Sequence, residues 1–183
     1  DEMFVAEKGN GAYMNNQRLR VSSRKKLEDC IIFTGGPKYD AKDKNLSLKE
    51  YNNFSSKVLI PIRKLGSASL DIAYVAAGRC DGFWQRNLNY WDIAAGIIIL
   101  KEAGGFITDF NGGNEYVKNK TVLATNAKIN NEMIEPIVFT TWMNLLQKRI
   151  IQDDLGQLHV EFQHFRPLFL ERVFKNINNA NQW

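Results

Sequence analysis

The stretch from Tyr90 to Gly105 constrains the fold most, because it predicts one helix that is apolar on almost every side. One face follows the helical i, i+3, i+4, i+7 spacing with Ile93, Gly96, Ile97 and Leu100. The other sides carry further apolar residues: Ile98, Ile99 and Ala103. The Gly104-Gly105 pair allows the positive φ that commonly ends a helix. A helix of this composition is expected to be buried within a layered structure.

Asp92 is the acid in the first turn of this helix, and two interpretations of it stay open. The commoner one is a cap, because first-turn acids satisfy free backbone N–H groups. The other is a ligand for a divalent cation. The helix dipole favours the ionised carboxylate, which is a hard oxygen ligand.

Composition predicts an ordinary globular domain. The 183 residues are 44% hydrophobic and 24% charged, enough for a real core. No apolar run reaches the roughly 18 residues that span a membrane, so we expect no membrane partner and a cytoplasmic location. The two cysteines, Cys30 and Cys80, match no metal spacing and are expected to be buried thiols of a reducing compartment. The net charge of +4 is dispersed, which favours solvated surface over a nucleic-acid groove.

Three regions follow from the residue pattern. Residues 1–29 predict a β-meander, with strands at 3–7, 12–14 and 17–21 joined by tight turns. We expect its sheet to include strands preceding residue 1, so the chain is interpreted as a fragment. Residues 30–136 predict an α/β domain because strands alternate with helices. Its strands are expected at 30–34, 58–62, 83–85, 106–109 and 121–125. A surface helix with a loop is expected within 38–57, and further helices at 68–77, 90–103 and 126–134.

Pro136 predicts a break in the chain, followed by a tail of unknown nature at 137–183. This tail shows an amphipathic helical pattern from Val138, an alternating strand at 158–162 and an apolar stretch at 167–174. His159 and His164 share no face of a strand or helix, so they do not predict a metal site.

Three further features are candidates for ligand binding. Gly66-Ser67-Ala68 opens a helix, and its N–H groups suit a phosphate or hydroxyl-rich ligand, although an ordinary capped helix start also explains it. Arg63 could pair with an anion bound there, or form a solvated basic pair with Lys64. Gln85 ends a strand and could bind a substrate hydroxyl, or be a surface amide.

Several blocks in order carry a resemblance to a known family. Residues 91–96 (Trp-Asp-Ile-Ala-Ala-Gly), followed by Glu-Ala-Gly-Gly at 102–105, resemble the C-terminal signature of the inositol monophosphatase family, in its bacterial type. Residues 66–78 resemble the helix before that signature, and residues 1–23 resemble the segment that links the two halves of these enzymes. The resemblance is continuous from residue 1 to about residue 135.

The resemblance implies a layered α-β-α-β-α sandwich of the sugar-phosphatase type, represented here by its C-terminal half plus the N-terminal β-meander. It implies Mg²⁺-dependent hydrolysis of inositol monophosphate or a similar sugar phosphate, and a homodimer for full-length members. By position, Asp92 resembles the metal-binding aspartate, and Arg63 a substrate-contacting arginine of bacterial members. Residues 66–68 (Gly66, Ser67 and Ala68) resemble the backbone that faces the inositol ring. Gln85 stands where many members have a glutamate, which leaves the substrate preference open.

The chain also departs from the family pattern. The other metal ligands of the family come from a Glu-Glu motif and an Asp-Pro-(Ile/Leu)-Asp-Gly motif, and none of the four prolines here follows an aspartate. We therefore assign no catalytic residue to this chain and expect it to be inactive alone. The alternative is a truncated, non-catalytic binding or interaction module.

Overall fold

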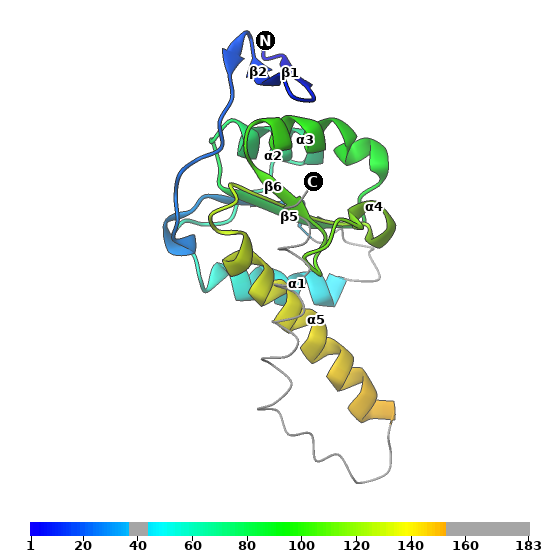
Figure 1. Ribbon diagram of the computed structural model, residues 1–183. Coiled ribbons are helices and arrows are strands. Elements are labelled where there is room, and N and C mark those ends of the chain that lie inside the picture. Colours follow the sequence, from blue (N-terminus) through cyan, green and yellow to red (C-terminus); the bar gives the residue numbers. More distant parts are fainter. Residues whose placement is uncertain (37–43, 153–183) are drawn as a thin grey trace.

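The computed structural model of the protein describes residues 1–36 and 44–152, which form four layers (Figure 1). A small β-meander lies outermost, helices α2 and α3 come next, a four-stranded sheet follows, and α1 and α5 cover its far face. The strands are β1 (Phe4–Glu7), β2 (Gly11–Met14), β3 (Gln17–Arg18), β4 (Ile32–Thr34), β5 (Gly82–Arg86), β6 (Phe106–Thr108) and β7 (Thr121–Thr125). The helices are η1 (Leu27–Asp29), α1 (Lys44–Ser55), α2 (Ala68–Ala76), α3 (Tyr90–Glu102), α4 (Tyr116–Asn119) and α5 (Asn130–Gln152). The predicted α/β layered fold is confirmed.

The central sheet has the strand order β4-β5-β7-β6, with β4 and β5 parallel and the other pairs antiparallel. Successive residues of a strand face opposite sides, so each strand serves two cores. In β5, Phe83 faces the core under α2 and α3, whereas Trp84 faces the core under α1 and α5. Because β4 and β5 are parallel, their carboxyl ends meet at one edge of the sheet.

The predicted apolar helix is α3, and its predicted glycine stop is confirmed by Gly104 with φ +84°. Gly96 lies at the crossing of α3 with α2, where a Cβ atom would come within 2.9 Å of Ile72 Cγ2. The small residue therefore allows the two helices to approach closely. The expected all-round burial is only partly found, because Ile93, Gly96, Ile99 and Leu100 are buried whereas Tyr90 and Trp91 are 58% and 77% exposed.

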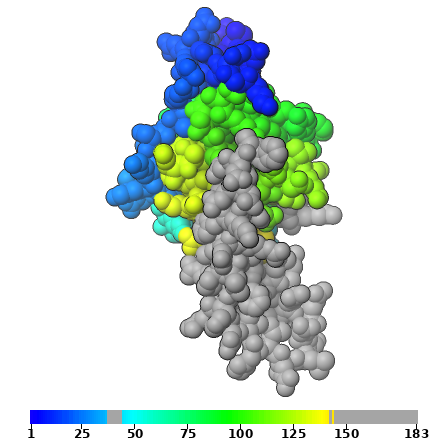
Figure 2. All heavy atoms as spheres, viewed as in Figure 1, coloured from blue at the N-terminus to red at the C-terminus, as the bar shows by residue number. Residues whose placement is uncertain are grey.

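The predicted β-meander is confirmed, with Asn15 and Asn16 at positive φ in its second turn. Figure 2 shows it as the blue cap on the green helices. Its first turn is held by the Glu102 carboxylate at the end of α3. That group accepts the Gly9 N–H at 2.9 Å and the Gly11 N–H at 3.0 Å. The meander is thus fixed to the end of α3 opposite Asp92.

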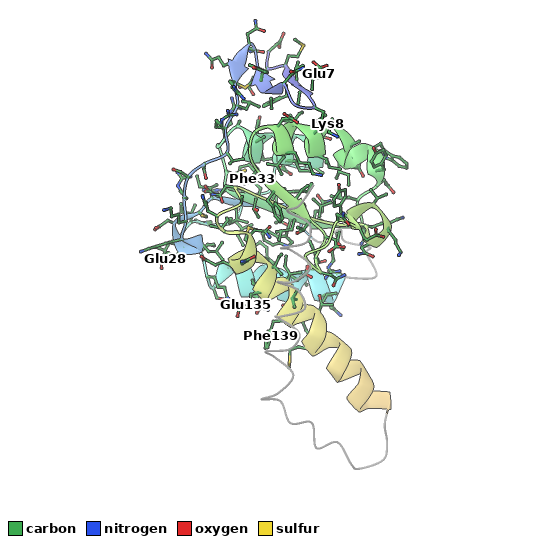
Figure 3. All side chains as sticks on the ribbon, viewed as in Figure 1. Glu7, Lys8, Glu28, Phe33, Glu135 and Phe139 are labelled. Carbon is green, nitrogen blue, oxygen red and sulfur yellow. The ribbon has the colours of Figure 1, made fainter. Side chains whose placement is uncertain are left out.

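Helix α1 is a surface helix, as expected, with one buried face that includes Glu50 and Phe54. Its Phe54 is fully buried and stacks on Trp84, with ring centroids 4.3 Å apart. Figure 3 shows Phe33 in the sheet layer and Glu135 and Phe139 on α5, with side chains filling the space between the layers. Cys30 and Cys80 are free and buried, as predicted, and burial raises the pKa of the Cys30 thiol to about 12.

The strand predicted for Val58–Ile62 is wrong. The segment forms no strand, and its neighbour Arg63 makes only an isolated bridge to Phe33. Pro61 has no N–H to donate, which prevents a continuous ladder beside β4. Beside β4 the Arg63 N–H donates to Ile32 O at 3.0 Å and the Arg63 carbonyl accepts the Thr34 N–H at 2.9 Å, whereas the Leu59 N–H donates to the Glu28 carbonyl of η1.

The helix end predicted at Pro136 is also wrong, because α5 continues through this residue. Ile134 and Ile137 are fully buried on either side of the proline, and this packing outweighs the lost helical hydrogen bond. The division of the chain at 1–29, 30–136 and 137–183 stays a prediction. The strand at 158–162, the apolar stretch at 167–174 and both histidines lie outside the described residues. Within residues 1–36 and 44–152, no helix combines the length and apolarity needed to cross a bilayer.

Candidate functional site

A pocket of about 280 Å³ lies where the carboxyl ends of β4 and β5 meet the first turns of α2 and α3. Its lining residues are Gly35, Gly66, Ser67, Ala68, Ser69, Gln85, Leu88 and Asp92. Five of the six predicted site residues therefore come together although they span 27 positions of the sequence, from 66 to 92. The lining is polar and largely uncharged, with one carboxylate.

Asp92 occupies the third position of α3 and forms a capping box with Asn89. The Asn89 N–H donates to Asp92 Oδ2 at 2.9 Å, so the cap interpretation is confirmed. Among the described residues, the other carboxylate oxygen, Oδ1, accepts no hydrogen bond from the protein. Capping therefore leaves one oxygen for a ligand, and the two interpretations of Asp92 are compatible.

Ser69 ties the two helix starts together, because its Oγ donates to the Asp92 carbonyl at 2.8 Å. Ser67 is the N-cap residue of α2 but makes no side-chain cap bond, so its hydroxyl does not cap the start of the helix. Gly66 has φ +99° and no atom within 4 Å of a Cβ placed on it, so the turn before α2 faces open space. The turn and the first residues of α2 thus present polar groups to the pocket.

Gln85 points to the pocket because of its register in β5. It lies two residues after Phe83 and shares that residue's side of the sheet, toward α2 and α3. Its amide lies over Gly35, where any Cβ would overlap the Gln85 side chain. Gly35 is therefore required for this side-chain position, and sequence reasoning missed it together with Ser69 and Leu88. The available signal was the parallel pairing of β4 and β5, which brings both strand ends together.

Arg63 is the predicted site residue that does not line the pocket. Its backbone is bound to β4, and the residue is exposed. The neighbouring Lys64 crosses the turn after β4, because a Cβ on Gly36 would overlap the end of the Lys64 side chain. A role for Arg63 in substrate binding stays a prediction.

Comparison with known proteins agrees with this geometry. The model of the Inositol monophosphatase family matches residues 1–140. The chain belongs to this family. The predicted resemblance is therefore confirmed over the greater part of the sequence.

Three relatives show how far the similarity extends. The inositol-1-monophosphatase of Mesorhizobium japonicum is 44% identical over 137 residues, covering 75% of this chain and 51% of that protein. The Nus factor SuhB of Pseudomonas aeruginosa is 46% identical over 129 residues, covering 69% and 47%. The crystal structure of extragenic suppressor protein SuhB from Bartonella henselae superposes with a TM-score of 0.71 at 47% identity, covering 75% and 53%. The chain spans about half the length of the curated relatives it matches.

The number of available ligand residues limits how this member of the inositol monophosphatase family could bind a metal ion. Within the described ranges, no group of three His, Cys, Asp or Glu residues is close enough to hold a metal ion. Mg²⁺ is commonly bound by one or two carboxylates together with waters and substrate phosphates. Asp92 fits as one such ligand. The remaining ligands are not provided by the part of the chain described.

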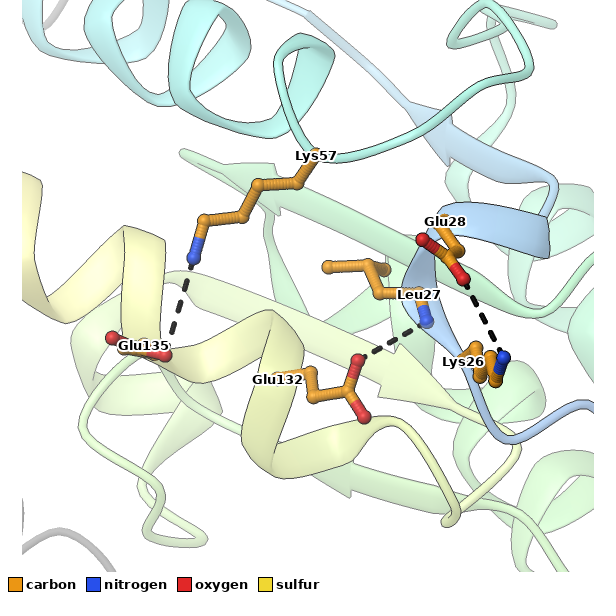
Figure 4. A pocket seen from close by; sticks show the side chains of 6 residues that line it. All are labelled: Lys26, Leu27, Glu28, Lys57, Glu132 and Glu135. Atoms are coloured by element: carbon orange, nitrogen blue, oxygen red, sulfur yellow. Dashed lines mark hydrogen bonds and ion pairs between the residues drawn. The ribbon is translucent and has the colours of Figure 1, made fainter.

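A larger cavity of about 480 Å³ lies between η1, the segment after α1, and α5, and it shares no lining residue with the first pocket (Figure 4). Its charged side chains already have partners. Lys57 pairs with Glu135 at 3.9 Å, and Glu132 accepts the Leu27 N–H at 3.1 Å. The cavity with the greater volume is therefore not the better candidate for a site.

Proposed function

We propose that this chain provides one metal ligand and part of the substrate pocket of a Mg²⁺-dependent phosphomonoesterase that acts on inositol monophosphate or a similar sugar phosphate. The observation that carries the proposal is the pocket itself, which unites Asp92 with residues 66–68 and Gln85. The names of the relatives support the substrate class, since that of Mesorhizobium japonicum is an inositol-1-monophosphatase.

Each lining group has a chemical task in this proposal. Asp92 would hold the cation through its carboxylate, whose Oδ2 also accepts the Asn89 N–H. A bound Mg²⁺ would supply Lewis-acid chemistry that neutralises phosphate charge and activates a water. Ser67 and the backbone of Gly66 bind the ring of the substrate. The Gln85 amide both donates to and accepts from a ring hydroxyl, without adding negative charge near the phosphate.

The wider setting of the site is also proposed. The whole protein is expected to be a cytoplasmic homodimer whose partner is a phosphorylated small molecule. Its remaining metal ligands are expected outside this chain, because Asp92 alone does not complete a site.

The test is turnover by the isolated chain. With inositol 1-phosphate and Mg²⁺, we expect no phosphate release above background and weak Mg²⁺ binding by calorimetry. Robust turnover by the 183-residue chain would contradict the proposed division of the site between this chain and another segment.

A second candidate is a non-catalytic interaction module, and one observation favours it. Relatives of similar identity, such as that of Pseudomonas aeruginosa, carry the name Nus factor SuhB. The test is capture of protein partners by the whole chain and by a truncation after Gln152, which leaves α5 intact. Unchanged partners after truncation would exclude a role for residues 153–183 in binding.

A further inference from the structure

Asp71 is a buried acid that the proposed function does not use. It lies in α2, one turn after Ser67, and its side chain has no exposed surface. Neither Oδ1 nor Oδ2 has a hydrogen-bond partner within the described part of the chain. Most buried polar groups are paired, and an unpaired ionised carboxylate is among the costliest groups to bury.

Among the described residues, the surroundings of Asp71 offer no cation. Helix α2 packs against α3, β5 and β7, which contribute to the apolar core that includes Ile72, Val75 and Phe83, and its Tyr74 ring contacts Phe4 of β1. The titratable neighbour is Cys80, a buried thiol whose Sγ lies 3.9 Å from the Asp71 carbonyl. Burial raises the pKa of that thiol, and the charges of Asp81 and Asp71 raise it further. Cys80 is therefore neutral and cannot compensate an ionised carboxylate.

Two opposing effects act on the Asp71 carboxyl. The N-terminus of α2 favours the charged form, since the helix dipole is positive there. Burial favours the neutral form and is the larger effect, because it raises the pKa of Asp71 from 3.8 to about 6. Asp71 therefore changes its charge at mildly acidic pH.

Helix α2 connects this acid to the pocket. Its first residues, from Ala68, line the pocket, and Ser69 Oγ holds the Asp92 carbonyl at 2.8 Å. Ile72, next to Asp71, packs against Gly96 of α3 with no space for a methyl group. The first turns of α2 and α3 are thus linked by the Ser69–Asp92 hydrogen bond, and the helices are in tight contact one turn later at Ile72 and Gly96.

We propose that Asp71 is a proton-operated switch that sets how tightly the first turns of α2 and α3 are joined at the pocket. The neutral carboxyl is tolerated in the apolar core and keeps the turns together. The ionised carboxylate draws water to itself, loosens the first turn of α2 and weakens the Ser69–Asp92 bond. The switch does not depend on the phosphatase proposal, because it acts on the packing of two helices in this chain.

The experiment measures amide hydrogen exchange of the intact 183-residue chain between about pH 5.0 and 7.5, corrected for intrinsic exchange rates. A carboxyl whose pKa is raised by folding loses its stabilising proton as the pH rises through the folded-state pKa. In the wild type, protection of residues 68–76 is therefore expected to fall about tenfold over this range. Asp71→Asn and the smaller Asp71→Ser are expected to show no such fall. The exposed-acid control Asp29→Asn is expected to behave as the wild type.

Ser69→Ala separates the switch from a merely costly buried acid. In this variant the pH response of α2 is expected to remain, whereas the response of residues 90–96 at the start of α3 is expected to disappear. The proposal is overturned if the Asp71 variants keep the wild-type response. It is also overturned if residues 90–96 never respond, or respond equally without the Ser69 hydroxyl.

Discussion

Gln85 and Arg86 are consecutive residues of β5, and their side chains lie on opposite sides of the sheet in different environments. Gln85 faces α2 and α3 and lines the open pocket. Arg86 faces α1 and α5, where its Nε donates to Glu50 Oε1 at 2.9 Å and its guanidinium lies 4.7 Å from the centroid of the Phe110 ring. On the second side Arg86 and Glu50 satisfy each other, whereas Gln85 on the first side is open to the pocket.

The same contrast holds for the buried acids. Glu50, 1% exposed, is neutralised by Arg86, whereas Asp71, also buried, has no cation beside it in the described part of the chain. Both sides bury an apolar core of similar kind, so apolar packing does not distinguish them. Cavity volume alone therefore does not identify the candidate site, because the larger cavity, on the α5 side, already has its charged side chains paired.

The largest expected effect on stability is on the paired side. Glu50→Ala leaves Arg86 largely buried without its carboxylate, and we expect a loss of about 3–5 kcal/mol of unfolding free energy. Urea unfolding measures this loss of unfolding free energy. The matched control is Glu28→Ala, which removes an exposed pair with Lys26 at 3.7 Å and is expected to cost less than about 0.5 kcal/mol. Equal losses of unfolding free energy in the two variants would show that the buried Glu50–Arg86 pair stabilises the protein no more than the exposed pair does.

Gly96→Val tests the close approach of the helices on the pocket side. A Cβ at this position already meets Ile72 at 2.9 Å, so the larger side chain forces α2 and α3 apart. We expect a loss of about 2–3 kcal/mol in urea unfolding. The neighbouring exposed residue provides the control, since Ala95→Val changes only helix propensity, worth about 0.5 kcal/mol. A Gly96→Val protein as stable as the control would show that the helices are not in tight contact.

Glu102→Gln tests the attachment of the meander. The carboxylate accepts two backbone N–H groups, whereas an amide has one acceptor oxygen and no charge. We expect a loss of about 1 kcal/mol and faster exchange of the Gly9 and Gly11 amides. Glu7→Gln, which affects one exposed bond to Asn10, is the control and should leave exchange at Gly9 unchanged. Identical exchange in both variants would exclude the proposed anchoring role.

Asp92→Asn is expected to have the smallest effect on stability. An asparagine oxygen can still accept the Asn89 N–H, so only the charge at the helix start is lost, at a cost of about 0.5 kcal/mol. Thermal unfolding measures this change. A loss above about 2 kcal/mol would show that the Asp92 carboxylate is mainly structural, and would weaken its assignment as a metal ligand.

The sequence predicted the elements whose signals are local. The glycine stop at Gly104 and the tight turn at Asn15-Asn16 depend on backbone preferences that neighbouring residues carry. The strand at Val58–Ile62 and the end at Pro136 failed because tertiary contacts decided them: the backbone of Arg63 beside β4, and the burial of Ile137.

The residues of the candidate site were likewise predictable only in part. Asp92 and Gln85 were recognised by their place in a family pattern, and the structure brings both to one pocket. Gly35 could not be found from its own neighbours, because its role depends on the Gln85 amide lying across it from the next strand. The unpaired state of Asp71 likewise follows from what surrounds α2 in space and from no local pattern.

Asp92 is proposed to be one metal ligand of a site that another segment completes. The direct measurement joins this chain, as wild type or as the Asp92→Asn variant, to the segment of the Mesorhizobium japonicum inositol-1-monophosphatase outside the matched 137 residues. Phosphate release from inositol 1-phosphate is then followed against Mg²⁺ concentration. We expect Mg²⁺-dependent turnover by the wild-type fusion, and a kcat/KM at least about a hundredfold lower for the Asp92→Asn fusion. Equal turnover by both proteins would exclude Asp92 as a ligand of the catalytic metal.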